Sequence, residues 1–211
     1  MNRGFRPQVR QRSTPKVKDG KVQRKNRHLP TRSGPLIQRE QPGAGFRHVV
    51  RKNDIVQFIG LLPDWDELSV GLHEIILAAG DKNTAGWHRP GVVAICAWKR
   101  EVHREQTEGF LEDHASLYDR LGIPYTWIDD TECEDDGYFW VHFTDESIRA
   151  YQLLHILLHE LGHHHDRMTT RPKIRASRGE SFAEQYALKN EAIVLTRYCE
   201  AFGFRVSRTN T

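Results

Sequence analysis

Apolar residues recur at helical spacing between residues 147 and 166, in the stretch SIRAYQLLHILLHELGHHHD. They follow one another at steps of three and four residues, the period of a helix with one buried face, at Ile148, Tyr151, Leu154, Leu158 and Leu161. The four residues from Thr144 to Ser147 supply a Thr or Asp cap and an early acidic residue, which suit the positive end of a helix. The pattern therefore predicts a long helix that begins near residue 147.

Three further regions have helical patterns. A closing helix is predicted from about Gly179 to Ala201, after a basic loop over 167–178 that contains Pro172. A helix is expected over 109–121, because Gly122 and Pro124 follow it as they often follow helix ends. A short helix capped by Asn53 or Asp54 and a helical turn over 65–68 are predicted near the start of the folded part.

Several shorter apolar runs are typical of strands. Residues 72–79 favour a strand because Gly residues bracket them, and residues 91–98 are rich in Val and Ile. The intervening Gly, Asn and Pro residues of 81–90 have the pattern of a hairpin loop. Aromatic and β-branched residues predict strands over 125–128 and 138–143, joined by an acidic turn, and a short strand over 46–50. We expect an α+β domain: a small mixed or antiparallel sheet of three to five strands, packed with helices.

Charge divides the chain into two unlike parts. Residues 1–52 contain fifteen Lys or Arg against only Asp19 and Glu40, whereas residues 53–211 carry 16 basic and 26 acidic side chains. Residues 1–45 are also punctuated by Pro and Gly and poor in apolar residues, which predicts a disordered basic tail. The domain is then expected over 46–203 and a flexible C-terminus over 204–211. The basic residues of 1–52 could make weak contacts with nucleic acid or another polyanion.

The cysteines and the lack of long apolar runs bear on location. Cys96, Cys133 and Cys199 are odd in number and widely spaced, so no disulfide framework or paired zinc ribbon is predicted. No apolar stretch approaches the length of a membrane span, and the N-terminus lacks the apolar core of a secretory signal. We expect no membrane partner and a cytoplasmic location.

Candidate chemistry lies inside the long predicted helix, in the sequence His159-Glu160-Leu161-Gly162-His163. Two imidazoles four residues apart lie on one side of a helix and can hold one metal ion. The carboxylate of Glu160 is offset by about 100° around the helix, close enough to contact a water on the metal. The chain thus contains an HExxH signature on a convincing helix.

With this motif, the region 147–187 resembles the zincin metallopeptidases, and its continuation resembles the gluzincin branch. No His occurs after His165, so a downstream third ligand would be a carboxylate unless Cys199, His164 or His165 serves. The sequence Glu180-Ser181-Phe182-Ala183-Glu184 is similar to the gluzincin ExxxD pattern. The resemblance implies Zn²⁺ bound by His159, His163 and Glu180, with Glu184 or Asp166 as alternative third ligands.

The same resemblance implies a function and a minimal zincin-like core, in which the HExxH helix precedes a C-terminal helix that carries the ligand. The expected activity is hydrolysis of a peptide or protein substrate by a metal-activated water, with Glu160 as general base. Glu184 would support a ligand His by accepting its other ring proton. Candidates for stabilising the oxyanion are Tyr186, His155, His164 and Arg171. Two alternatives stay open: a non-catalytic zinc-stabilised domain, and a nucleic-acid-associated protein that acts through the basic tail.

Overall fold

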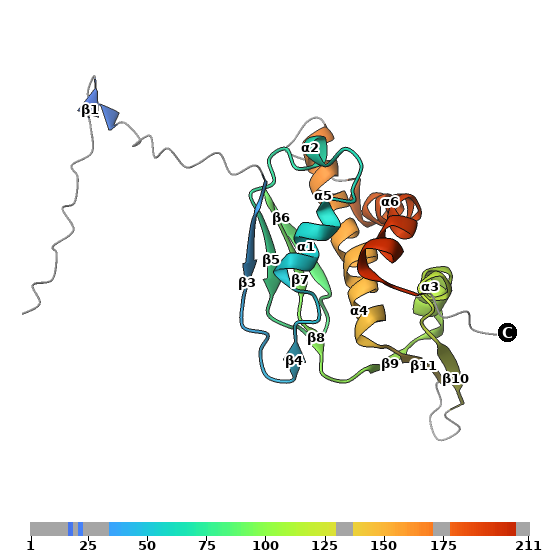
Figure 1. The fold of residues 1–211 in the computed structure, drawn as a ribbon. Coiled ribbons are helices and arrows are strands. Elements are labelled where there is room, and N and C mark those ends of the chain that lie inside the picture. Colours follow the sequence, from blue (N-terminus) through green and yellow to red (C-terminus); the bar gives the residue numbers. More distant parts are fainter. Residues whose placement is uncertain (1–16, 19–20, 23–33, 130–136, 171–177, 206–211) are drawn as a thin grey trace, which may run out of the picture. The chain divides into compact units, whose positions relative to one another are not determined.

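The computed structural model describes residues 17–18, 21–22, 34–129, 137–170 and 178–205, and the chain divides into the units 1–33 and 34–211 (Figure 1). In the first unit, β1 (Val17–Lys18) pairs antiparallel with β2 (Lys21–Val22). The other residues of this unit lie outside the described residues, and with them most of the predicted disordered tail. The second unit contains the long predicted helix and the candidate site.

The predicted boundary at residue 46 is wrong, because the folded unit already begins at Gly34. Strand β3 (Leu36–Arg39) pairs in parallel with β5 (Glu74–Ala78) through its backbone. Three of its four side chains are exposed, so the strand needs no apolar pattern. At the other end, Phe204 is buried against Tyr198, with ring centroids 5.8 Å apart, although it falls in the predicted flexible C-terminus.

The main sheet has four strands in the order β3-β5-β7-β6. Strands β5 and β7 (Val92–Cys96) are parallel, so the predicted hairpin between residues 72–79 and 91–98 is wrong. The predicted loop contains β6 (Gly86–Arg89), which pairs antiparallel with β7 at the edge of the sheet. Ile75 and Leu77 of β5 lie beside Val93 and Ile95 of β7 on one face of the sheet, where all four side chains are buried in the main hydrophobic core.

Smaller sheets and helices complete the domain. Strand β4 (Phe46–Arg47) pairs with β8 (Trp98–Lys99). A second antiparallel sheet has the order β10-β11-β9 and combines β10 (Tyr125–Ile128), β11 (Tyr138–His142) and β9 (His103–Gln106). The helices α1 (Lys52–Ile59), α2 (Trp65–Leu68) and α3 (Glu108–Arg120) form near the three predicted positions. The predicted cap of α1 is wrong, because its N-cap is Arg51, whose N–H donates to the Asp54 carboxylate at 2.8 Å. Most of the predicted acidic turn, residues 130–136, lies outside the described residues.

The predicted site helix forms, but it is not α-helical throughout. Helix α4 (Asp145–Tyr151) passes into a π-helical segment (Gln152–Leu157) and then into α5 (Leu158–Thr169). Thr144 caps α4 by accepting a hydrogen bond from the Ser147 N–H at 3.1 Å. Within the π segment, Gln152 donates its side-chain amide to the Cys96 carbonyl of β7 at 2.8 Å. This bond ties the helix to the sheet immediately before the HExxH residues.

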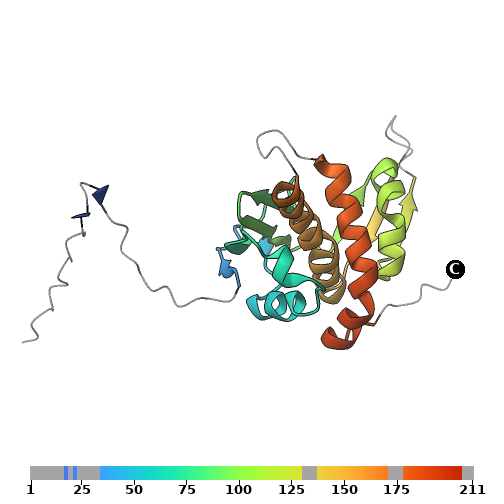
Figure 2. The same ribbon diagram turned by 90° about the horizontal axis from the view of Figure 1, so that it is seen from above.

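Helix α6 (Gly179–Phe202) packs directly along α5, and Figure 2 shows it between α5 and α3. Gly162 permits this close approach, because a Cβ there would lie 3.0 Å from the Cα of Ala183. The α5 side chains Leu158 and Leu161 are fully buried in the main hydrophobic core. The predicted α+β class, with small sheets packed against helices, is confirmed. None of the helices in the described ranges combines the length and apolar composition needed to cross a bilayer.

Candidate metal centre

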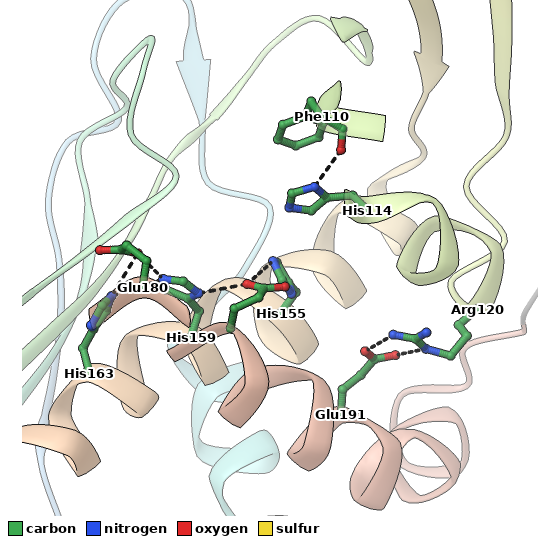
Figure 3. Close-up of polar contacts among 9 residues, drawn as sticks. Phe110, His114, Arg120, His155, His159, His163, Glu180 and Glu191 are labelled. Atoms are coloured by element: carbon green, nitrogen blue, oxygen red, sulfur yellow. Dashed lines mark hydrogen bonds and ion pairs between the residues drawn. The ribbon is translucent and has the colours of Figure 1, made fainter. Parts of the chain in front are cut away.

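Helices α5 and α6 bring His159, His163 and Glu180 together (Figure 3). The Nε2 atoms of the two imidazoles are 3.2 Å apart, as expected for residues one turn apart on a helix. The Glu180 Oε2 atom, from the first turn of α6, lies 3.1 Å from Nε2 of His159 and 3.4 Å from Nε2 of His163. Three potential ligand atoms from two helices therefore converge on one point.

The spacing of these three atoms fits a zinc ion. A tetrahedral site with bonds of about 2.0–2.1 Å has ligand atoms about 3.3–3.4 Å apart. The three separations of 3.1, 3.2 and 3.4 Å are close to that edge length. Two imidazole nitrogens and one carboxylate oxygen are also a donor set that Zn²⁺ prefers. The residues that the resemblance assigns to zinc thus have the geometry and chemistry to hold it.

Glu184 lies one turn beyond Glu180 and contacts the opposite side of the His159 ring. The Nδ1–H of His159 donates to Oε2 of Glu184 across 3.2 Å. Burial is the largest single effect and opposes both charges, but the bond and the neighbouring charges together exceed it. The pKa of Glu184 therefore falls, and the pKa of His159 rises with help from the nearby Glu160. The bond fixes the ring so that Nε2 faces Glu180, which is the supporting role expected for Glu184.

Glu160 is buried beside the metal-binding cluster rather than within it. Its side chain is 7% exposed, and this burial raises its pKa to about 7. The edge strand β6 encloses it: a Cβ on Gly86 would lie 2.8 Å from Oε1 of Glu160 and 2.9 Å from the Ala94 carbonyl oxygen. A glycine at position 86 therefore makes room for the carboxylate.

All these groups line one cleft of about 630 Å³ between β6, α3 and the helix pair. The helix pair contributes six polar side chains to the lining: His159, Glu160, His163, Arg167, Glu180 and Glu184. Arg167 is the single Lys or Arg among the described residues that line it. A neighbouring cavity of about 550 Å³ shares residues 83–85 with this cleft.

Asp166, His164 and His165 make their contacts away from the metal-binding cluster. Asp166 accepts hydrogen bonds from Arg178 and Thr170, with the Arg178 Nε at 2.6 Å. His164, an alternative ligand from the sequence, is fully buried, and its Nε2 lies 3.0 Å from the Val70 carbonyl oxygen. His165 stacks on Tyr186 with ring centroids 5.3 Å apart. Of the alternatives, Glu184 alone reaches the cluster, through Nδ1 of His159.

The residues considered for the oxyanion do not form one group. Tyr186 is paired with His165, His164 with Val70, and Arg171 lies outside the described residues. His155 does line the cleft, and burial lowers its pKa to about 4.

Two cleft residues, His88 of β6 and His114 of α3, were not anticipated from the sequence. The His88 ring stacks on His163 with centroids 6.1 Å apart. Neither lies in a recognisable motif, and only tertiary packing brings them to the site.

Comparison of the chain with protein-family models, with curated proteins and with solved structures finds no match in any of the three. The resemblance to zincins therefore stays a prediction that depends on the residues of the HExxH and ExxxE segments.

Proposed function

We propose that this chain is a zinc-dependent metallopeptidase. The observation that carries the proposal is the convergence of Nε2 of His159, Nε2 of His163 and Oε2 of Glu180 at 3.1–3.4 Å, with the Glu160 carboxylate beside them in the same cleft. The described residues contribute three donors to this group, which corresponds to the open coordination of catalytic zinc sites rather than the closed four-ligand set of structural ones.

The chain's own residues have distinct roles in this proposal. When bound, zinc supplies Lewis-acid chemistry: it acidifies a coordinated water and polarises a carbonyl. His159, His163 and Glu180 hold the ion, and Glu184 keeps the His159 ring in its binding orientation. Glu160 takes a proton from the attacking water and returns it to the leaving amine. Arg167, at the cleft, stabilises negative charge on the substrate.

The edge strand favours an extended peptide as the substrate. Strand β6 pairs with β7 on one side only, and within the described residues no strand pairs with its other side. An extended peptide can add to such an edge through main-chain hydrogen bonds. Because β6 also packs against α5, a peptide aligned on it would run past Glu160 and the two imidazoles. Cytoplasmic action belongs to the same proposal, supported by the free thiols of Cys96 and Cys199.

A peptide-library digest tests this function. The zinc-loaded protein should cleave peptides, and a chelator should abolish the cleavage. Glu160→Gln should retain zinc and fold but lose about two to four orders of magnitude in rate. Glu146→Gln, an exposed position on α4, is the matched control and should stay active. Stoichiometric zinc without chelator-sensitive cleavage would refute the peptidase and favour a zinc-stabilised domain.

A further inference from the structure

A second cluster of metal-binding side chains lies next to the first. His114 of α3, His155 of the π-helical segment and Glu184 of α6 place one donor atom each within 4.8 Å of one another. All three line the same cleft as the HExxH residues. Figure 3 shows His114 and His155 on the side of the cleft away from His163.

The His114 ring is oriented as a metal ligand would be. Its Nδ1–H donates to the backbone carbonyl of Phe110, one turn earlier on α3, at 2.8 Å. A carbonyl oxygen can only accept, so the proton is on Nδ1 and Nε2 keeps its lone pair. Donation of the remaining ring N–H to a backbone carbonyl is a common way in which proteins fix a metal-binding imidazole.

His155 lacks the hydrogen bonds that its burial calls for. The residue is 4% exposed, and its Nδ1 has no hydrogen-bond partner among the described residues. Its Nε2 lies 3.7 Å from Oε2 of Glu184, beyond hydrogen-bond distance. Leaving a buried polar ring unpaired is unfavourable, and buried polar groups in native proteins are nearly always satisfied. A cation between His155, Glu184 and His114 would bind Nε2, the nitrogen that faces Glu184, and would give the buried ring a polar partner.

The scaffold around this cluster holds the donors in place. Glu191, fully buried on α6, accepts two hydrogen bonds from Arg120 of α3, at 2.9 and 2.7 Å. Arg120 and Glu191 each lie about two turns beyond His114 and Glu184 on the same helices. This bidentate ion pair thus fixes the distance between the helices that carry two of the three donors (Figure 3).

We propose that His114, His155 and Glu184 form a second zinc site, distinct from the HExxH site and linked to it through Glu184. Two imidazoles and a carboxylate are again a suitable donor set for Zn²⁺. The cleft's three carboxylates, Glu160, Glu180 and Glu184, carry enough charge to balance most of two divalent ions. Because the donors of the second cluster are farther apart than those of the first, they must move closer on binding, so this site binds zinc more weakly. The proposal does not depend on peptidase activity.

Titration of the metal-free protein with Zn²⁺ tests the second site. Bound metal, measured by elemental analysis and chelator competition at neutral pH, should reach two equivalents, one tighter than the other. His114→Ala should lose the weaker equivalent and keep the tighter one, whereas His163→Ala should do the opposite. His165→Ala is the control, because His165 belongs to neither cluster, and should bind two equivalents.

The outcomes separate this proposal from that of the first site. One equivalent in the wild type, lost in His163→Ala and kept in His114→Ala, overturns the second site and leaves the first. One equivalent that is lost only in His114→Ala supports the second and removes the first, and no binding removes both. If circular dichroism shows that His114→Ala does not fold, His155→Gln, which keeps a polar side chain of similar size, should show the same loss of one equivalent.

Discussion

A tight contact between α5 and α6 lies at Gly162, and replacing this glycine by Ala should weaken zinc binding without removing a ligand. The added Cβ would lie 3.0 Å from the Cα of Ala183, 3.1 Å from its carbonyl oxygen and 3.1 Å from the Cβ of Tyr186. None of these atoms can rotate away, because two are backbone atoms and the third is fixed to the backbone. Ordinary carbon contacts are about 3.5–4.0 Å, so the helices must separate by a few tenths of an ångström.

Two opposing effects set the change in folding stability. Replacing Gly by Ala within a helix stabilises it by about 1 kcal/mol. Overpacking of a tight contact costs about 1–3 kcal/mol. The metal-free variant should therefore lose about 0–2 kcal/mol.

The higher helix propensity of Ala offsets the strain in folding stability, but it does nothing for zinc binding. Glu180 lies one turn before Ala183 on α6, so separation of the helices moves its Oε2 away from both imidazoles. We expect zinc affinity at the HExxH site to fall about 10- to 100-fold, the range found when groups that support ligands are disturbed.

The assay compares zinc affinity, by chelator competition, with the melting of the metal-free protein. Gly109→Ala is the matched control, because a Cβ at this position in α3 has no atom within 4 Å. It should retain wild-type zinc affinity. Wild-type affinity in Gly162→Ala as well would show that the helix spacing does not set the position of Glu180, and would refute the reasoning.

Two further predictions concern carboxylates. Glu180→Ala should abolish tight zinc binding at the HExxH site. Glu184→Ala should weaken this binding about 10- to 100-fold, since the variant leaves the three ligands in place. If Glu184→Ala instead lost zinc and Glu180→Ala kept it, the third ligand would be Glu184, one helical turn later. Burial raises the pKa of Asp166, but the hydrogen bonds from Thr170 and Arg178 together exceed this effect and lower the pKa. The ionised Asp166 side chain therefore contributes to stability above the ordinary pKa of 3.8, and this contribution is lost as the pH falls below 3.8. Asp166→Asn should cost about 1.5–3 kcal/mol at pH 7 and less at pH 2, measured by denaturant unfolding. Equal costs at both pH values would contradict this, and Asp113→Asn, exposed on α3, is the control.

The helices were predictable because each buries one face, and the strands only in part. Leu158 and Leu161 repeat at helical spacing and are fully buried, so the period reports the packing directly. The π-helical segment changes the hydrogen-bond register, but the run 153–158 is apolar apart from His155, and the hydrophobic pattern therefore gives no sign of the segment. Strands β3 and β6 were missed because they lie at the sheet edges and hold their places by backbone pairing, with side chains that are exposed or half-buried.

The residues of the candidate site were likewise predictable only in part. The spacing of His159 and His163 on one helix is local, and it is enough to predict that their Nε2 atoms meet. Glu180 could be suggested only by resemblance, because the segment that joins the helices sets where α6 begins. His114 and His155 are 41 positions apart and meet only because α3 packs against the helix pair. No local pattern encodes that contact.

Residues without functional groups also determine the geometry of this site. Gly162 lets α6 approach α5 until Glu180 reaches the two imidazoles, and Gly86 lets β6 approach until it encloses the Glu160 carboxylate. In both places a single methyl group would meet backbone atoms within about 3 Å, so the constraint is on shape rather than on charge. The HExxH spacing fixes two donors on one helix, but these two glycines bring the neighbouring helix and strand against it. The positions of the third donor and of the proton acceptor thus depend on backbone packing as much as on the motif.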